Sequence, residues 1–516
     1  MTKAQSVKRG IHSLALLSAL VLAGCSSTDP NMNLPAAVKT AGSADQITKS
    51  AHKANAQTGP EVLMSAGQNN GSYNNMRRAL VRSELPAKNG IQLAEWVNFF
   101  PYDYPQTQGR IPFSAVSEMA NTPWNPNTRL LRVAIKADDA QTSERRAANL
   151  VVFVGADGSD LSLIKLSLTR LVNQLTAQDS LAIITTAGDN GVLLAPTYGS
   201  SKDKMLSAID NLKSGKANKD TDRLSQAYSL AKEHYLTDGI NRVILAGNSN
   251  FSAGFKDIAE AQNFFANQQN SGVSLTALGF TATQFTPSSL AEIADEGNGV
   301  YSYIDNQRDA DKIWSEQLRS TQTPVAKDFS MKVEFNPSYV KAYRLLGYQA
   351  PATDNESANK GIVVTGQTLT ALYEVIPAGD AGSWAGQEFG PIYTPSNSSY
   401  LSKTKEMAMV HLRYHKPTAQ GDSQRIELPV PASRMNTPLK DSSQDFRFAA
   451  AVAAFAQQLK DGGVTTGNFT LNDTLKLANE GQGSDKFELR GEFIQLVKNA
   501  QEALPKASPV KGKEDK

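Results

Sequence analysis

The stretch between residues 147 and 322 constrains the fold most, because continuous apolar runs alternate there with segments of helical periodicity. Apolar runs of this kind are typical of strands buried on both faces, and their alternation with helices predicts a mostly parallel sheet covered by helices. Residues 188–191 read Gly-Asp-Asn-Gly, a hairpin signal that predicts one antiparallel edge. Strands are expected at 150–154, 181–185, 192–195, 243–246, 275–280 and 300–304, and helices near 164–175, 224–235, 257–268 and 290–296.

The segments on either side of this α/β domain have other patterns. After Pro324 apolar and polar residues alternate at 331–335, 368–375 and 407–414, which predicts antiparallel sheets packed as a sandwich. An amphipathic helix at 91–100 and strands at 113–118 and 129–135 are expected before the domain, and helices from Ser443 onward after it. The predicted divisions are 71–146 (helix plus β), 147–322 (α/β), 323–440 (β-rich), 441–505 (helical) and 506–516 (a disordered tail).

The first 25 residues indicate export. Three basic residues precede an apolar stretch from Ile11 to Ala23, which is too short for the roughly 20 residues of a membrane-spanning helix. It ends in Leu-Ala-Gly-Cys25, which resembles a bacterial lipoprotein signal, and Cys25 is the only cysteine of the chain. Residues 1–24 are therefore predicted to be a signal peptide, with Cys25 lipidated as the new N-terminus.

Removal of residues 1–24 takes away three basic and no acidic side chains, so the formal net charge changes from +2 to −1. A near-neutral body has no field to attract nucleic acid, so a nucleic-acid partner is not expected. Residues 25–70 are polar and small and are predicted to be a flexible tether. Ser26 and Ser27 resemble the residues after the cysteine of lipoproteins sent to the outer membrane, where we expect the protein to face the periplasm.

Several aromatic-rich motifs resemble the YfbK-like family, which are bacterial lipoproteins with a von Willebrand factor A (VWA) domain. The resemblance covers nearly the whole chain from about Ser72. It implies a Rossmann-like VWA domain at 147–322, flanked by a β-rich, sandwich-like region and a C-terminal helical region. The motifs are Tyr-Asn-Asn-Met-Arg-Arg (73–78), Val-Asn-Phe-Phe-Pro-Tyr-Asp-Tyr-Pro (97–105), Pro-Trp-Asn-Pro (123–126), Val-Glu-Phe-Asn-Pro (333–337), Tyr-Arg-Leu-Leu-Gly-Tyr (343–348), Thr-Ala-Leu-Tyr-Glu-Val-Ile-Pro (370–377) and Glu-Phe-Ile-Gln-Leu-Val (492–497).

The resemblance also implies a position for a metal site. VWA domains commonly hold Mg²⁺ through an Asp-x-Ser-x-Ser loop, a threonine from a second loop and an aspartate from a third, because Mg²⁺ prefers hard oxygen ligands. Here both aspartate positions have lost their carboxylates, so we expect no bound metal or other cofactor. The corresponding residues are Gly155, Asp157 and Ser159 in the first loop, Asn218 in the second and Asn248 in the third.

Three interpretations of these loops remain open. Asp157 introduces a carboxylate where the family has serine, and together with Ser159, Asp160, Asn218, Asp220 and Asn248 it would form a rebuilt site for Mg²⁺ or Ca²⁺. Alternatively, Asp157 and Ser159 cap the following helix. The third interpretation is a metal-free surface that contacts an envelope protein.

Other residues offer little chemistry. His411 and His415 lie in an alternating segment that predicts a strand, along which four residues span about 13 Å, too far for one ion. Trp96, Trp124 and the aromatic residues near Pro101 are expected in the core, with an exposed recognition patch as the alternative. No common catalytic motif is present. The sequence thus predicts a lipid-anchored, non-enzymatic protein-binding scaffold, with a metal-dependent adhesion module or an envelope hydrolase as alternatives.

Overall fold

A computed structural model describes most of the chain after residue 59, within the compact unit Ala36–Lys516. The described residues are 60–63, 71–107, 111–138, 146–155, 161–187, 191–215, 220–248, 251–268, 270–280, 289–297, 299–319, 324–347, 362–379, 384, 391–396, 399–417 and 423–504. Cys25, Asp157, Ser159 and Asn218 lie outside these ranges.

The α/β domain is built on a six-stranded sheet with the order β6-β5-β4-β7-β8-β9. Neighbouring strands are parallel except for β5 and β6, which are antiparallel, so the predicted parallel sheet and its antiparallel edge are both confirmed. The strands are β4 (Ala148–Gly155), β5 (Ser180–Thr185), β6 (Val192–Tyr198), β7 (Ile240–Gly247), β8 (Ser274–Phe280) and β9 (Val300–Ile304).

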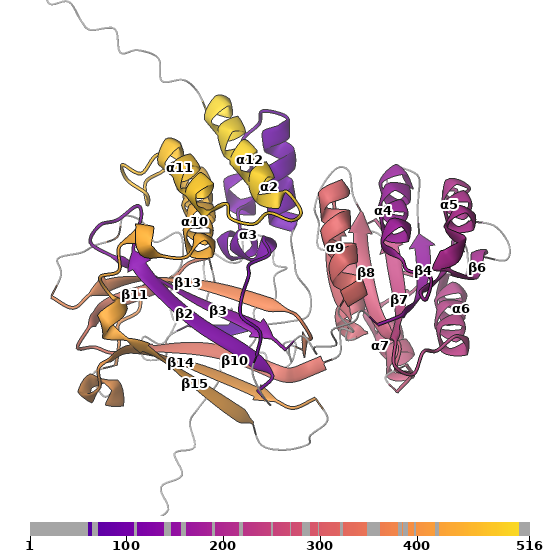
Figure 1. Ribbon diagram of the computed structural model, residues 1–516, viewed down its shortest axis with the longest axis horizontal. Coiled ribbons are helices and arrows are strands. Elements are labelled where there is room, and N and C mark those ends of the chain that lie inside the picture. Colours follow the sequence, from indigo (N-terminus) through magenta and orange to yellow (C-terminus); the bar gives the residue numbers. More distant parts are fainter. Residues whose placement is uncertain are drawn as a thin grey trace, which may run out of the picture. The chain divides into compact units, whose positions relative to one another are not determined.

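Helices cover both faces of this sheet (Figure 1). One face packs against α4 (Leu161–Gln174), α5 (Lys202–Asp210) and α9 (Gln307–Arg319). The opposite face packs against α6 (Asp220–Glu233), α7 (Ile258–Ala266) and α8 (Ser289–Glu296). The central strands β4 and β7 are buried along their whole length, which explains why their sequences show no polar alternation.

Two further antiparallel sheets pack face to face around a common core, as the alternating sequence pattern predicts. One sheet has the order β1-β10-β14-β15 with β12 beside β10, and the other has the order β11-β13-β3-β2. The strands are β1 (Glu61–Leu63), β2 (Phe113–Asn121), β3 (Arg129–Ala137), β10 (Pro324–Phe335), β11 (Val340–Leu345), β12 (Ile362–Val364), β13 (Thr368–Pro377), β14 (Glu406–His415) and β15 (Gln424–Pro431).

The segments before and after the α/β domain belong to the same sandwich. β3, from the predicted division 71–146, pairs along its length with β13, from the predicted division 323–440. The α/β domain is therefore an insertion in the loop that connects β3 to β10, and the two divisions share one core.

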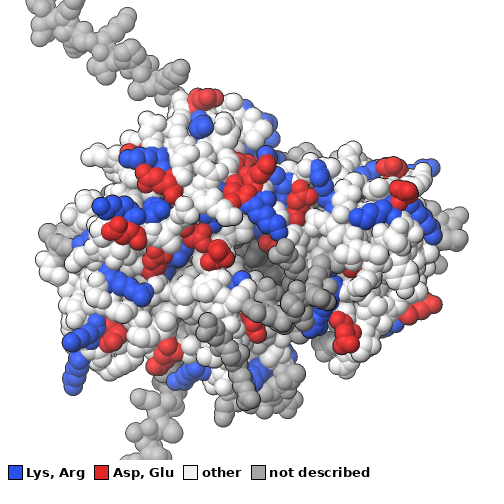
Figure 2. Space-filling model, in the orientation of Figure 1, with Lys and Arg blue, Asp and Glu red and all other residues white. Residues whose placement is uncertain are grey.

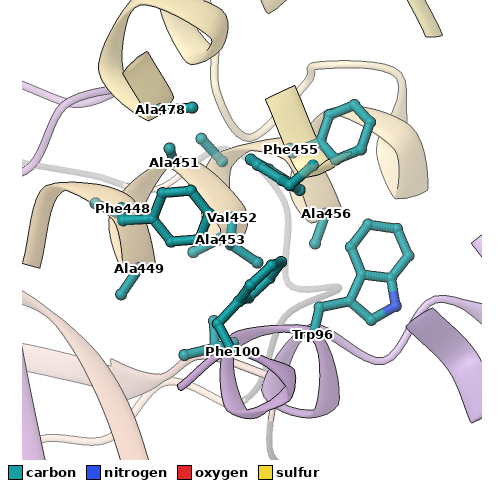
Figure 3. Close-up of a cluster of buried hydrophobic side chains, with 14 of the residues drawn as sticks. Trp96, Phe100, Phe448, Ala449, Ala451, Val452, Ala453, Phe455, Ala456 and Ala478 are labelled. Atoms are coloured by element: carbon teal, nitrogen blue, oxygen red, sulfur yellow. The ribbon is translucent and has the colours of Figure 1, made fainter. Parts of the chain in front are cut away.

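Helices from both ends of the chain cover the outer face of the second sheet (Figure 1). These helices are α2 (Gly71–Val81), α3 (Leu93–Phe99), α10 (Gln444–Asp461), α11 (Leu471–Gly481) and α12 (Leu489–Ala503). The central one, α10, begins after Ser443, whose side chain accepts the N–H of Phe446, and ends at Gly462 in a left-handed conformation. Its alanines let neighbours approach closely. Trp96 of α3 and Phe100, which directly follows α3, face Phe448, Val452 and Phe455 of α10 (Figure 3).

The motif at residues 97–105 fixes α3 against β13. The Asn98 side chain accepts the backbone N–H of Thr370 at 2.7 Å and donates to its carbonyl at 2.9 Å, as a neighbouring strand would. The hydroxyl of Tyr104 lies 2.6 Å from that of Thr370. Trp96, Trp124 and the aromatic residues around Pro101 are buried, so their predicted core position is confirmed.

The predicted tether is wrong at its C-terminal end. Glu61–Leu63 form β1, which pairs antiparallel with Lys332, Met331 and Ser330 of β10. Val62 is fully buried in the sandwich core, and this burial explains why a polar segment contains a short strand.

A buried ion network links the start of the described chain to the α/β domain and to α12. Arg77 of α2 donates to Asp309 of α9 at 3.0 Å and to Glu492 of α12 at 3.2 Å. It also contacts Asp305 at 3.4 Å, and only 3% of its side chain is exposed. Arg78 donates to the hydroxyl of Tyr303 at 2.8 Å. The arginines of the motif at 73–78 therefore have a structural role.

Glu95 predicts a pH dependence of stability. Its carboxylate accepts the backbone N–H groups of Ser72 and Tyr73 at the first turn of α2. Burial raises the pKa of Glu95 from 4.5 to about 8, and the two N–H donors act in the opposite direction. The folded protein thus binds more protons than the unfolded chain between about pH 4.5 and about pH 8, so the free energy of unfolding falls as pH rises through this window.

The test is urea unfolding of the parent protein and Glu95→Gln at pH 5 and pH 8. Between pH 5 and pH 8 the free energy of unfolding of the parent should fall by at least about 1.4 kcal/mol more than that of the variant. This difference corresponds to one pKa unit. Equal losses in the two proteins would contradict the raised pKa.

Candidate functional site

The site predicted from the sequence lies at the carboxyl edge of the α/β sheet, where ligands of open α/β folds bind. β4 ends at Gly155 and the neighbouring β7 ends at Gly247, and these two glycines are partners in the parallel register. The first and third loops therefore leave the sheet side by side. Of the residues predicted for the site, the structure describes Gly155 and Asn248.

An aromatic ring fills the space where a side chain of residue 155 would lie. A Cβ atom added to Gly155 would overlap the ring of Phe251, and one added to Gly247 would lie 2.6 Å from Cδ1 of the same ring. Phe251 is only 8% exposed, and its ring packs edge-on against Phe153 of β4 with centroids 5.2 Å apart. The position that the resemblance assigns to the first metal ligand thus lies beside the hydrophobic core.

A backbone hydrogen bond holds Phe251 close to the end of β7. The backbone N–H of Phe251 donates to the carbonyl of Asn248 at 3.1 Å. Asn248 itself is half-buried. Its amide is neutral, so it attracts a divalent cation less than the aspartate usual at this position would.

The end of β5 and the start of the antiparallel β6 lie at the same edge. The hydroxyl of Thr186 donates to the carbonyl of Gly215 at 2.7 Å, and a Cβ on Gly215 would lie 2.8 Å from Cα of Ala187. This close packing fixes where the chain enters the second loop. The guanidinium of Arg223 lies against Gly191 and adds a positive charge to this edge of the sheet.

The described residues do not fit the metal site that the resemblance implies. Gly155 supplies no side-chain oxygen, and a Cβ atom at that position would overlap the ring of Phe251. Within the described ranges no group of three or more His, Cys, Asp or Glu side chains is arranged to hold a metal ion. The rebuilt site and the helix-capping role both depend on Asp157 and Ser159, which lie outside those ranges.

Phe251 and Gly247 are the site residues that the sequence analysis missed. A signal was present, because a glycine ends each of two neighbouring buried strands and an aromatic residue follows shortly after the second. Glycine at a strand end often marks the close approach of another group. The register that places the two glycines opposite each other is visible only in the folded chain.

A second cluster of polar residues lies on the sandwich. His411 and His415 are on β14, as predicted, and the imidazole of His411 lies 3.2 Å from Glu334 and 3.5 Å from Glu427. The hydroxyl of Ser399 donates to the other oxygen of Glu334 at 2.6 Å. A carboxylate therefore separates the serine from the histidine, whereas a serine nucleophile needs the histidine beside its hydroxyl.

The six-stranded sheet with helices on both faces defines a VWA-like α/β domain, here inserted into a β-sandwich with a helical layer. A family model described as "Uncharacterized protein YfbK, C-terminal" matches residues 320–503, and one described as "von Willebrand factor" matches residues 44–132, before the inserted domain. "Uncharacterized protein YfbK" of Escherichia coli (strain K12) is 33% identical over 458 residues, which cover 86% of this chain and 78% of the relative. The chain belongs to the YfbK-like VWA family.

Solved structures also match. "Von Willebrand factor type A from Catenulispora acidiphila" is 14% identical, with a TM-score of 0.32 and coverage of 75% of this chain and 91% of that one. The "conserved hypothetical protein BatB from Bacteroides thetaiotaomicron" is 16% identical, with a TM-score of 0.26 and coverage of 33% of this chain and 96% of that one.

Proposed function

We propose that this protein is a lipid-anchored, non-enzymatic scaffold of the bacterial envelope whose VWA domain binds a protein partner without a metal ion. The observation that supports this most is the ring of Phe251 in the place of the first metal ligand. The partner would contact the carboxyl edge of the sheet through shape and through polar groups such as the Asn248 amide. The loop residues Asp157, Ser159 and Asn218 belong to the same proposed surface.

The charge distribution is compatible with a protein partner rather than nucleic acid. Basic and acidic side chains are interspersed over the face shown in Figure 2. Mixed charge of this kind gives little long-range attraction for a polyanion. Among the helices in the described ranges, none is long and apolar enough to cross a membrane. The proposed attachment to the outer membrane, facing the periplasm, rests on the sequence around Cys25.

Site-specific photocross-linking in cells tests the proposed surface. A photoreactive amino acid at Asn248 lies after the carboxyl end of β7, and the same group at the exposed Asp238 lies before its amino end. The two positions therefore flank one strand at opposite edges of the sheet. We expect an adduct with an envelope protein at Asn248, unchanged by a chelator, and none at Asp238. The same adduct at both positions, or none at Asn248, would exclude this surface.

Calorimetric titration addresses the metal directly. The full-length protein in detergent should show no saturable heat with Mg²⁺, Ca²⁺ or Mn²⁺ up to millimolar concentration, because the usual carboxylate ligands are missing. Binding that disappears in Asp157→Ala would instead establish the rebuilt site and a metal-dependent adhesion module.

The anchor is tested separately. Cys25→Ser should move the protein from the membrane fraction to the soluble fraction, since stable attachment of a lipoprotein depends on its acyl chains. Unchanged membrane association of the variant would disprove the lipid anchor without affecting the proposed contact surface.

A further inference from the structure

The edge of β10 that faces away from β14 is covered by two very short strands. β12 pairs with Pro324–Lys327, and β1 pairs with Ser330–Lys332. β14, in contrast, follows β10 from Lys327 to Phe335. The unpaired backbone groups at the edge of a strand can pair with an additional strand. Here the three residues of β1, from the N-terminal segment, form that additional strand.

The register defines what this edge accepts. Val62 lies opposite Met331, and both side chains are fully buried in the sandwich core. Glu61 lies opposite Lys332, and both side chains are half-buried on the outer face. The edge therefore selects an extended segment with an apolar residue for the core, preceded by an acidic residue that complements Lys332.

The strand that occupies this edge is weakly held. Its ladder comprises three residue pairs and buries the side chain of Val62, while ordering the backbone of three residues opposes the gain. Seven residues, 64–70, connect it to α2 in the sequence. β1 is favoured mainly because it belongs to the same chain, which gives it a high effective concentration at the edge.

We propose that the β10 edge at Ser330–Lys332 is a strand-addition site for an extended acidic-apolar segment of a partner protein, and that β1 occupies it until that segment displaces it. In this mode the backbone ladder supplies affinity, and the positions of Val62 and Glu61 supply specificity. This inference is independent of the VWA loops and of lipidation.

A synthetic peptide tests the site. The probe is a fluorescein-labelled peptide of residues 58–66, which contains the natural strand, and the control probe is the same peptide with Val62→Asp. In the full-length protein, Val62→Asp releases β1 from the edge. Fluorescence anisotropy should show saturable binding of the natural peptide to this variant, at least about tenfold tighter than to the parent protein, whose own strand competes. The control peptide should bind neither protein.

An engineered disulfide provides the complementary test. Glu61→Cys with Lys332→Cys places two thiols on directly opposed residues, a spacing that suits a disulfide. Oxidation should abolish peptide binding to this variant, and reduction should restore the binding that the same variant shows before oxidation. His411→Cys with Glu427→Cys, also directly opposed, should leave binding unchanged in both states.

Three outcomes would overturn the proposal. First, the natural peptide binds neither Val62→Asp nor a second variant that releases β1, Glu61→Pro. Second, the control peptide binds as tightly as the natural peptide. Third, oxidation of the Glu61→Cys/Lys332→Cys variant leaves peptide binding unchanged. If the Glu61→Cys/Lys332→Cys disulfide forms between two chains, the occupant is a second copy of this protein rather than a different partner.

Discussion

Replacing Gly155 by aspartate is expected to destabilise the protein and to leave it without a magnesium site. The new Cβ overlaps the ring of Phe251, which is buried against Phe153 and cannot move without exposing apolar surface. Inserting atoms into a packed core costs about 1–3 kcal/mol. Chemical denaturation of Gly155→Asp and of the parent measures this loss of stability. Calorimetry with Mg²⁺ should show that the variant binds the ion no better than the parent does.

A double-mutant cycle identifies the ring as the cause. Phe251→Ala alone should lose about 3–5 kcal/mol, as expected for a large buried aromatic side chain. In the presence of Phe251→Ala, the aspartate has room, so the additional loss from Gly155→Asp should largely disappear and the two changes should be non-additive. Additive losses, or submillimolar Mg²⁺ binding by Gly155→Asp alone, would disprove the assignment of Phe251 to the ligand position.

Removal of the Arg77 guanidinium should strongly destabilise the folded protein. Arg77→Ala leaves Asp309, which is 2% exposed, beside Asp305 and Glu492 without the cation that compensates them. Breaking a buried ion pair by removing one partner costs about 3–5 kcal/mol. Urea unfolding followed by circular dichroism should show this loss.

Two further variants on α2 and just after it provide the controls. Arg77→Lys keeps the charge but loses the planar fork that reaches several acceptors, so its loss should be intermediate. Arg82→Ala removes an ion pair with Glu84 in which the arginine side chain is 59% exposed and the glutamate side chain 61% exposed. This variant should change the free energy of unfolding by less than about 1 kcal/mol. A loss for Arg77→Ala as small as that for Arg82→Ala would contradict the structural role of the network.

The sequence predicts well those parts of the fold that depend on local hydrophobic pattern. The sequence predicts strands β4, β5, β7, β8 and β9 because each is a short apolar run between polar segments. The sequence does not predict the pairing of β3 with β13, because the complete α/β domain lies between these strands in the chain.

For the candidate site, the resemblance indicates which oxygen ligands are missing, but the sequence does not indicate which side chain takes the place of the first one. The absence of a side chain at Gly155 follows from reading one loop. The role of Phe251 requires the register between β4 and β7, which is visible only in the folded chain, and the position of its ring between the two strand ends. The strand at Glu61–Leu63 was missed for a similar reason, because its partner on β10 is far away in sequence.

The insertion of one domain inside another also affects the order of folding. Asn499 of α12 donates to the carbonyl of Leu80 across 419 residues, and Asn98 bonds to Thr370 across 272 residues. The sandwich and its helices therefore cannot complete their contacts until nearly the whole chain has been synthesised, whereas the sheet of the inserted domain draws only on residues 148–304. Because domains generally fold as units and non-local pairing is slow, we expect the inserted domain to form first and to hold the two halves of the sandwich near each other.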